Sequence, residues 1–310
     1  MKLNELLNIK YPLIQGGMAN IATGEFAASV SNAGALGLIG AGGMDTATLK
    51  KNIEICRSLT DKPFGVNIML INPCADEMAQ LVIDEKVPVV TTGAGNPGKY
   101  VASWKEAGIK VLPVVPSVAL AKRLEKYNVD AIIVEGTEAG GHIGELTTMA
   151  LVPQVVEAVN VPVVAAGGIA SGKQVLAAYA LGACGVQVGT CLLASEECPI
   201  HDNYKQAVIK AKDTSTTVTG RIAGTPVRII KNKMAKEYVK REKEGADMLE
   251  LEKYTLGSLR RAVLEGDVDT GSLMAGQVVG MINEIKPIEI IIKELFDNCA
   301  IELKKLESEF

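Results

Sequence analysis

The amino-acid sequence predicts an α/β fold, a (β/α)8 TIM barrel with a small, mainly helical insert after the eighth strand. Eight short apolar runs recur at a mean spacing of about 25 residues, and helical patterns rich in Ala, Leu, Lys and Glu separate them. The runs are continuous rather than alternating, which is typical of parallel strands buried on both faces. The competing fold, a doubly wound sheet, more often has fewer strands and a nucleotide-binding loop after the first.

Each predicted strand is a short run rich in β-branched residues, and most of the runs end in Gly, Asn or Thr. This combination is typical of strands that pass directly into a tight turn. The eight predicted strands are Pro12–Gln15, Ala35–Gly40, Phe64–Met69, Val87–Gly93, Lys110–Val115, Asp130–Gly136, Val161–Gly168 and Gly185–Thr190.

The predicted helices lie between these strands, and several have residues that favour a helix start or end. Asp45, Ser117 and Ser171 stand where a side chain can cap the first turn. Gly108 and Gly182 stand just after the last helical residue, where glycine commonly ends a helix. The predicted helices include Thr46–Leu59, Cys74–Asp84, Lys99–Ala107, Val118–Tyr127, Thr148–Val159 and Gly172–Leu181.

The barrel strands are complete at Thr190, and 120 of the 310 residues follow. We therefore expect three parts. A barrel covers residues 1–197, an inserted lid or cap subdomain covers 198–270, and C-terminal helices over 271–310 pack back on the barrel. The insert contains a strongly basic run, Arg228–Lys243, with seven basic and two acidic residues.

Composition excludes several classes of function. The chain has 32 basic and 36 acidic residues and only 4% aromatics, which disfavours nucleic-acid binding by charge or stacking. No uncharged apolar run approaches ~18 residues, so no membrane span is expected. The first residues have no apolar signal region, and the six scattered cysteines include no CxxC pair, so we expect reduced thiols and a cytoplasmic location. Cys184, Cys191 and Cys198 lack a fourth ligand, so no metal site is expected.

The active site of such a barrel lies at the C-terminal ends of the strands, where this sequence places small and uncharged polar residues. The segments after the seventh and eighth strands contain Ala166-Gly167-Gly168 and Gly189-Thr190. Exposed glycine N–H groups and a following helix N-terminus, with Ser171 as its cap, favour a bound phosphate. The alternative is that these glycines only allow tight turns.

His142 is the main catalytic candidate. It is one of two histidines and follows the sixth strand in a glycine-flanked, flexible loop, where it could transfer a proton or polarise a carbonyl. The alternative is a buried structural histidine. The other histidine, His201, lies beyond the barrel strands, and we expect it at the surface.

One motif is misleading. Gly93–Gly98 matches GxGxxG, follows a strand and precedes a helix. A dinucleotide-binding fold would require an acidic residue about 20 positions later, at the end of the next strand. Residues 110–122 contain no acidic side chain, and the match falls on the fourth of eight strands. The sequence therefore disfavours a Rossmann domain.

Seven segments resemble a known superfamily. Four of them together resemble the FMN-dependent barrels that include nitronate monooxygenases and enoyl-acyl-carrier-protein reductase II: Ile14–Met18, Glu135–His142, Ala165–Ile169 and Gln187–Thr190. Three more resemble the reductase, the FabK type, in particular: Thr91–Tyr100, Gly144–Met149, and Gly266–Asp269 followed by Gly271–Gln277. The likeness extends over nearly the whole chain.

The resemblance implies a tightly bound, non-covalent FMN. Gly17, Met18 and Ala19 would lie beside the flavin ring, Asn67 at its polar edge, Gly167, Gly168, Gly189 and Thr190 at its phosphate, and Met274 and Gln277 over it. Further cofactor-binding positions implied by the resemblance are Thr92, Glu135, Gly141, Ala166 and Gln187.

The resemblance also implies a reaction. NADH or NADPH reduces the flavin, which then reduces a trans-2-enoyl thioester on acyl carrier protein in bacterial type II fatty acid synthesis. His142 would contact the thioester carbonyl or supply the proton. A nitronate monooxygenase, which oxidises alkyl nitronates with O₂, is the alternative. A homodimer is typical of the family.

The basic run Arg228–Lys243 allows two interpretations. Acyl carrier proteins are acidic, so the run could be a docking patch or a lid. It could equally be the solvated face of a helix.

Overall fold

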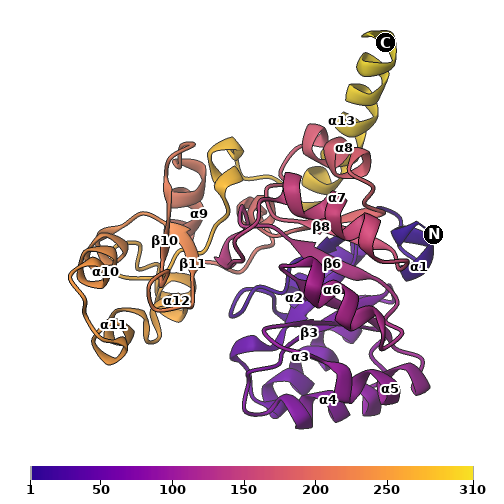
Figure 1. Cartoon of the computed structure of the whole chain (residues 1–310), viewed down its shortest axis with the longest axis horizontal. Coiled ribbons are helices and arrows are strands. Elements are labelled where there is room, and N and C mark those ends of the chain that lie inside the picture. Colours follow the sequence, from indigo (N-terminus) through magenta and orange to yellow (C-terminus); the bar gives the residue numbers. More distant parts are fainter. Residues whose placement is uncertain (1, 310) are drawn as a thin grey trace.

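The computed structural model describes residues 2–309, and its centre is a barrel of eight parallel strands in the order β1-β9-β8-β6-β5-β4-β3-β2 (Figure 1). A parallel bridge between Ile14 and Leu36 joins the first strand to the segment before the second and nearly closes the ring. This confirms the predicted (β/α)8 class. The barrel strands are β1 (Leu13–Gln15), β2 (Gly37–Gly40), β3 (Phe64–Met69), β4 (Val89–Gly93), β5 (Lys110–Val115), β6 (Ile132–Glu135), β8 (Val163–Ala166) and β9 (Gly185–Val188).

All eight predicted strands are present, but several begin later than predicted. Proline accounts for three of the shifts, because it has no backbone N–H to donate to a neighbouring strand. Pro12, Pro88 and Pro162 stand just before β1, β4 and β8. Each still accepts a backbone hydrogen bond through its carbonyl, from Val186, Lys110 and Ile132 respectively.

Helices cover the outside of the barrel, and local caps set their starts. The Asp45 carboxylate accepts a hydrogen bond from the Thr48 N–H at 2.8 Å, and the Ser117 hydroxyl accepts one from Leu120. These helices are α2 (Gly24–Asn32), α3 (Thr46–Leu59), α4 (Ala75–Asp84), α5 (Gly98–Glu106), α6 (Val118–Glu125), α7 (Thr148–Ala158) and α8 (Gly172–Ala180).

The predicted cap at Ser171 is wrong. Ser171 precedes α8, but its side chain accepts no hydrogen bond from the helix. Its hydroxyl donates instead to the side-chain oxygen of Gln174, which also accepts from the Ala170 N–H at 2.9 Å. The side chain of Gln174, and not that of Ser171, thus orders this turn.

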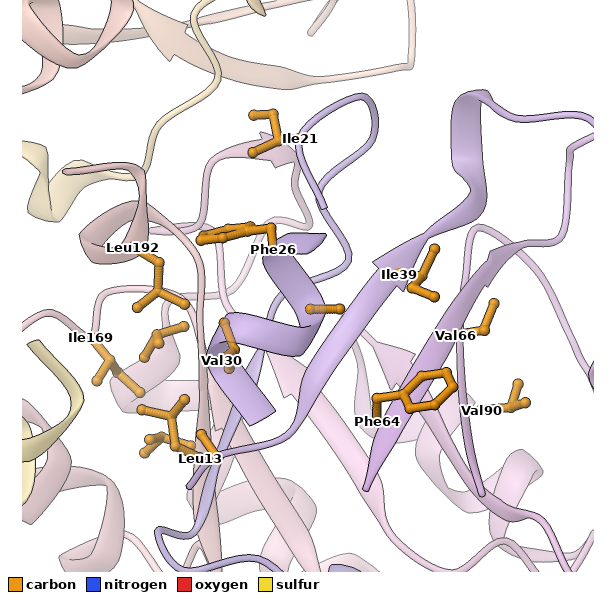
Figure 2. Close-up of a cluster of buried hydrophobic side chains, with 14 of the residues drawn as sticks. Leu13, Ile21, Phe26, Val30, Ile39, Phe64, Val66, Val90, Ile169 and Leu192 are labelled. Carbon is orange, nitrogen blue, oxygen red and sulfur yellow. The ribbon is translucent and has the colours of Figure 1, made fainter. Parts of the chain in front are cut away.

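The core has two layers, separated by the sheet. The inner layer fills the barrel, where α1 (Leu3–Leu7) inserts Leu3 and Leu7 against side chains such as Leu38 and Ile133. The outer layer lies between strands and helices, and Figure 2 shows side chains from α2 and from the first strands within it. The outer layer includes Leu13, Phe26, Val30, Ile39, Val66 and Val90. Successive strand residues therefore point alternately into and out of the barrel.

The segment after β9 forms a compact group of elements on one side of the barrel (Figure 1). It contains α9 (Asp202–Ile209), β10 (Thr216–Thr219), β11 (Val227–Ile230), α10 (Lys233–Lys243), α11 (Met248–Thr255), α12 (Ser258–Arg260) and a π-helical turn over Arg261–Glu265. It has its own apolar cluster, which includes Ile229, Tyr238 and Leu251. Helices predominate, but the β10–β11 hairpin was not predicted. The hairpin forms a three-stranded antiparallel sheet with β7 (Gly141–His142), which belongs to the loop after β6.

The chain then returns to the barrel through the short helix η4 (Gln277–Met281) and ends in α13 (Ile288–Glu309). Helix α13 packs along α8, and the approach is close enough that a Cβ atom at Gly172 would lie 2.3 Å from the Cys299 nitrogen. Its far end extends beyond the rest of the molecule (Figure 1). No helix within residues 2–309 is both long and apolar enough to cross a membrane.

Candidate active site

A cavity of about 680 Å³ opens at the C-terminal ends of the barrel strands. This volume is typical of sites for small molecules and cofactors. The cavity brings together fourteen of the sixteen predicted site residues: Gly17, Met18, Ala19, Asn67, Glu135, Gly141, His142, Ala166, Gly167, Gly168, Gln187, Gly189, Thr190 and Met274. They come from five barrel strands (β1, β3, β6, β8 and β9) or the loops that follow them, and from the segment that follows the insert.

The structure does not bring Thr92 and Gln277 to the cavity. Thr92 follows Thr91 on β4, and Val90, two residues before Thr92, belongs to the outer core layer. Thr92 therefore faces the helices, while Thr91 faces the barrel interior. The Thr91 hydroxyl accepts a hydrogen bond from the Asn67 side-chain amide at 2.8 Å. Gln277 is exposed, and its backbone N–H donates to the Glu138 carbonyl.

The segment after β1 lies very close to β3. A Cβ atom added to Gly17 would lie 2.3 Å from Cγ of Asn67, so only glycine fits at this position. Because Asn67 donates its amide hydrogen to Thr91, its carbonyl oxygen is left to accept a hydrogen bond from a ligand.

The loops after β8 and β9 form a cradle of backbone N–H groups. Gly167 and Gly168 have φ of +87° and +76°, which favours glycine at both positions. Tight turns alone account for these glycines, but not for the N–H groups of Gly167, Gly168 and Gly189, which have no hydrogen-bond partner within residues 2–309. Unpaired N–H groups near the start of α8 favour an anion such as a phosphate.

Two further polar groups on the cavity wall lack hydrogen-bond partners among residues 2–309. The side-chain oxygen of Gln187 is buried and accepts no hydrogen bond from any described residue. Burial raises the pKa of the Glu135 carboxyl to about 7, so both its protonated and its ionised form are populated near neutral pH. Buried polar groups normally have partners, so these two indicate a polar ligand.

His142 lies on β7, where it pairs with Val227 of β11. The expected flexible glycine loop is therefore part of a small sheet. The imidazole lines the cavity and is accessible from it. The protein around the cavity still removes part of its hydration, which disfavours the charged form and lowers the pKa of His142. The ring is therefore mainly neutral at pH 7 and can both donate and accept a hydrogen bond.

Met274 reaches the cavity from the segment that follows the insert. It forms an isolated antiparallel bridge with Ile229 of β11, and its carbonyl accepts a hydrogen bond from the Tyr204 hydroxyl at 2.8 Å. Its position thus depends on the insert.

Sequence reasoning missed one wall of the cavity. Gly224, Thr225 and Pro226 lie in the turn of the β10–β11 hairpin and line the opening. The run of β-branched residues in Thr216–Thr219 is a weak strand signal. No local signal could show that β11 pairs with a two-residue strand more than 80 positions earlier.

The GxGxxG match also has a different role from the one its pattern suggests. It belongs to the fourth strand of a barrel, so these residues form no Rossmann unit. Its first three residues, Gly93, Ala94 and Gly95, line the same cavity.

A (β/α)8 barrel with a glycine-lined cavity, an anion cradle and one cavity histidine defines a barrel protein with a binding site for a small anionic molecule. The family model described as nitronate monooxygenase matches residues 1–80 and 75–298. The chain belongs to the nitronate monooxygenase family.

The individual relatives and solved structures carry different names. A protein named probable nitronate monooxygenase from Staphylococcus saprophyticus is 34% identical and covers 94% of this chain and 97% of its own length. The structure of FabK from Thermotoga maritima is 48% identical, with a TM-score of 0.97 and coverage of 99% of this chain and 98% of that one. A nitroalkane oxidase from Streptomyces ansochromogenes is 28% identical, with a TM-score of 0.87 and coverage of 98% and 99%.

Proposed function

We propose that this chain is an FMN-dependent enoyl-acyl-carrier-protein reductase that uses NADH or NADPH, as in bacterial type II fatty acid synthesis. The observation that carries the proposal is the similarity to FabK over the whole chain, the insert included, at 48% identity. The relatives named probable nitronate monooxygenase are more distant, at 34%. A homodimer and a cytoplasmic location remain predictions.

The cavity residues fit FMN. The N–H groups of Gly167, Gly168 and Gly189 would hold the phosphate, and the unpaired oxygens of Asn67 and Gln187 would accept hydrogen bonds from the flavin ring. When bound, FMN supplies the hydride chemistry, taking hydride from NADH or NADPH and giving it to the β-carbon of the enoyl thioester.

His142 would act on the substrate. A neutral imidazole at the cavity wall can donate a hydrogen bond to the thioester oxygen, which becomes negative as the β-carbon accepts hydride, or can deliver the proton to the α-carbon. A single donor of this kind is typically worth about 10²–10³ in kcat. The lowered pKa favours hydrogen-bond donation by the neutral ring over delivery from an imidazolium.

Part of the basic run could dock the acidic carrier protein. Lys233, Lys236, Lys240 and Lys243 are exposed, and their spacing puts them on one face of α10. Arg228, by contrast, is buried and contributes nothing to this face. We define the four lysines as the lysine face and propose it as the docking surface for acyl carrier protein.

One experiment separates the two activities. The purified protein is examined for the absorbance of bound flavin and then assayed for NADH and NADPH oxidation that depends on crotonyl-CoA. The same preparation is tested with a propyl nitronate and O₂. Bound flavin with enoyl-dependent turnover supports the reductase. Nitronate oxidation without enoyl-dependent turnover would favour the monooxygenase, which the family and the 34% relatives support.

A further inference from the structure

The insert contains a buried positive charge with an unusual environment. Arg228, on β11, is only 6% exposed. No carboxylate within residues 2–309 forms an ion pair with it, and Glu138 acts on it only through space. Burying a guanidinium costs several kcal/mol unless its N–H groups are satisfied. We therefore ask which contacts of Arg228 compensate for the cost of burying its charge.

The guanidinium is satisfied mainly by one backbone carbonyl. Its Nε and Nη2 atoms donate to the carbonyl oxygen of Thr137 at 3.2 and 3.0 Å, and Nη1 donates to the Thr216 hydroxyl at 3.3 Å. Two parallel donors to one acceptor fix both the distance and the direction of that carbonyl. Arg228 thus joins the insert to the barrel at Thr137.

Thr137 stands near the start of the loop that carries His142, and the same strand also holds the end of this loop. Arg228 and Val227 of β11 pair with Gly141 and His142 of β7. One residue further, the Ile143 N–H donates to the Pro226 carbonyl at 3.1 Å. The β11 strand therefore clamps the His142 loop at both ends, with a side chain at the start and with backbone at the end.

The His142 side chain has no support of its own. Its imidazole forms no hydrogen bond with any described residue, and the preceding Gly141 has a φ of +76°. The position of the ring therefore depends on how firmly the loop backbone is held. Besides β11, three contacts hold the loop. The Thr137 N–H donates to the Leu146 carbonyl at 2.7 Å, the Glu138 carbonyl accepts from the Gln277 N–H, and the Glu138 carboxylate caps α7 at the Thr148 N–H. These contacts hold the Thr137 N–H and the middle of the loop, whereas the Thr137 carbonyl accepts its hydrogen bonds from Arg228.

We propose that Arg228 is a positioning residue for His142, and that it acts by fixing the Thr137 carbonyl at the start of the His142 loop. The proposal rests on the role given to His142 above. Its structural part, an ordered loop at 137–143, holds whichever substrate the enzyme uses.

The test compares three variants of the full-length holoprotein. Arg228→Met keeps the length and apolar stem but removes all donors. Arg228→Lys keeps the charge but replaces the planar fork of donors with a single ammonium group. Arg260→Met is the matched control, because Arg260 is an exposed arginine of the same insert.

Hydrogen exchange measured by mass spectrometry tests the structural part. In Arg228→Met we expect at least tenfold faster exchange in peptides covering 137–146, with unchanged exchange in α6 and an FMN dissociation constant within about twofold of the wild type. Arg228→Lys should lie between, and Arg260→Met should match the wild type. Unchanged exchange at 137–146 would overturn the proposal. If Arg228→Met does not fold, the same comparison is made with Arg228→Lys.

Rapid mixing separates positioning from general damage. The rate of flavin reduction by NADH should stay within about twofold, whereas the rate of reoxidation by crotonyl-CoA should fall about 10–100-fold, as expected when a reacting group is misplaced by roughly 1 Å. Equal losses in both rates would refute a role through His142. Faster exchange at 137–146 with no enoyl-dependent reoxidation in the wild type would contradict the proposed function and leave the loop-ordering role intact.

Discussion

Replacing Gly17 with alanine tests the closest contact in the site. The added Cβ atom would lie 2.3 Å from Cγ and 2.4 Å from Cβ of Asn67, whereas ordinary contact begins at about 3.4 Å. The two segments must separate by about 1 Å. The atoms in contact are at the base of the Asn67 side chain, so rotation of its end cannot relieve the clash.

The magnitude follows from what a 1 Å displacement breaks. Asn67 would lose its 2.8 Å hydrogen bond to Thr91, at about 0.5–1.5 kcal/mol. Overpacking a well-filled site adds about 1–3 kcal/mol. If Asn67 yields, Gly17→Ala should therefore lower the free energy of unfolding by about 2–4 kcal/mol. If the Gly17 segment yields instead, FMN affinity should fall by roughly 30-fold or more, since 1.4 kcal/mol corresponds to a factor of ten.

The assay is a fluorescence titration of apoprotein with FMN, combined with urea unfolding of the same sample. The matched control is Gly16→Ala, because the nearest atom to a Cβ there would be the Val188 carbonyl oxygen at 3.6 Å, an ordinary contact. Gly17→Ala protein with wild-type FMN affinity and wild-type unfolding free energy would refute the reasoning.

Three further predictions concern the other parts of the site. His142→Ala should retain FMN and lose about 10²–10³ in kcat with crotonyl-CoA, measured by NADH oxidation; full activity would contradict its role. The Glu135 carboxyl has a pKa of about 7 in the folded chain, against an ordinary value of 4.5. Between these pH values the folded apoprotein keeps the proton that the unfolded chain releases, so its free energy of unfolding should fall as pH rises from about 4.5 to 7. Glu135→Gln should remove that fall in thermal unfolding scans, and an unchanged pH dependence would count against it. Reversing the charges of Lys233, Lys236 and Lys240 to Glu should raise KM for a carrier-bound enoyl substrate and spare KM for crotonyl-CoA; equal changes in both would exclude docking at the lysine face.

Side-chain direction in the barrel strands could not be predicted from the sequence. Parallel strands buried on both faces are apolar at every position, so the alternation that marks direction in a half-exposed strand is missing. Thr91 and Thr92 illustrate this limit, because both are buried threonines and only Thr91 contacts Asn67. A one-residue difference in direction decides which of them reaches the site.

Pairing between residues far apart in the chain could not be predicted from the sequence either. Arg228 belongs to a basic run in the sequence, and only the fold shows that it is buried against Thr137 instead of lying on the lysine face. The same holds for Ser171, which has the right residue type and place for a cap, whereas Gln174 makes the hydrogen bonds.

The sequence by itself determined the barrel fold and which residues lie at the C-terminal ends of its strands. A period of about 25 residues and continuous apolar runs are local properties, and in a (β/α)8 barrel they bring the strand ends, with their glycines and His142, to one face. Only the tertiary structure decided how that face is held. The clamp of β11 on the His142 loop joins residues about 90 positions apart, and such contacts depend on the folded path of the whole chain and leave no periodic trace in the sequence.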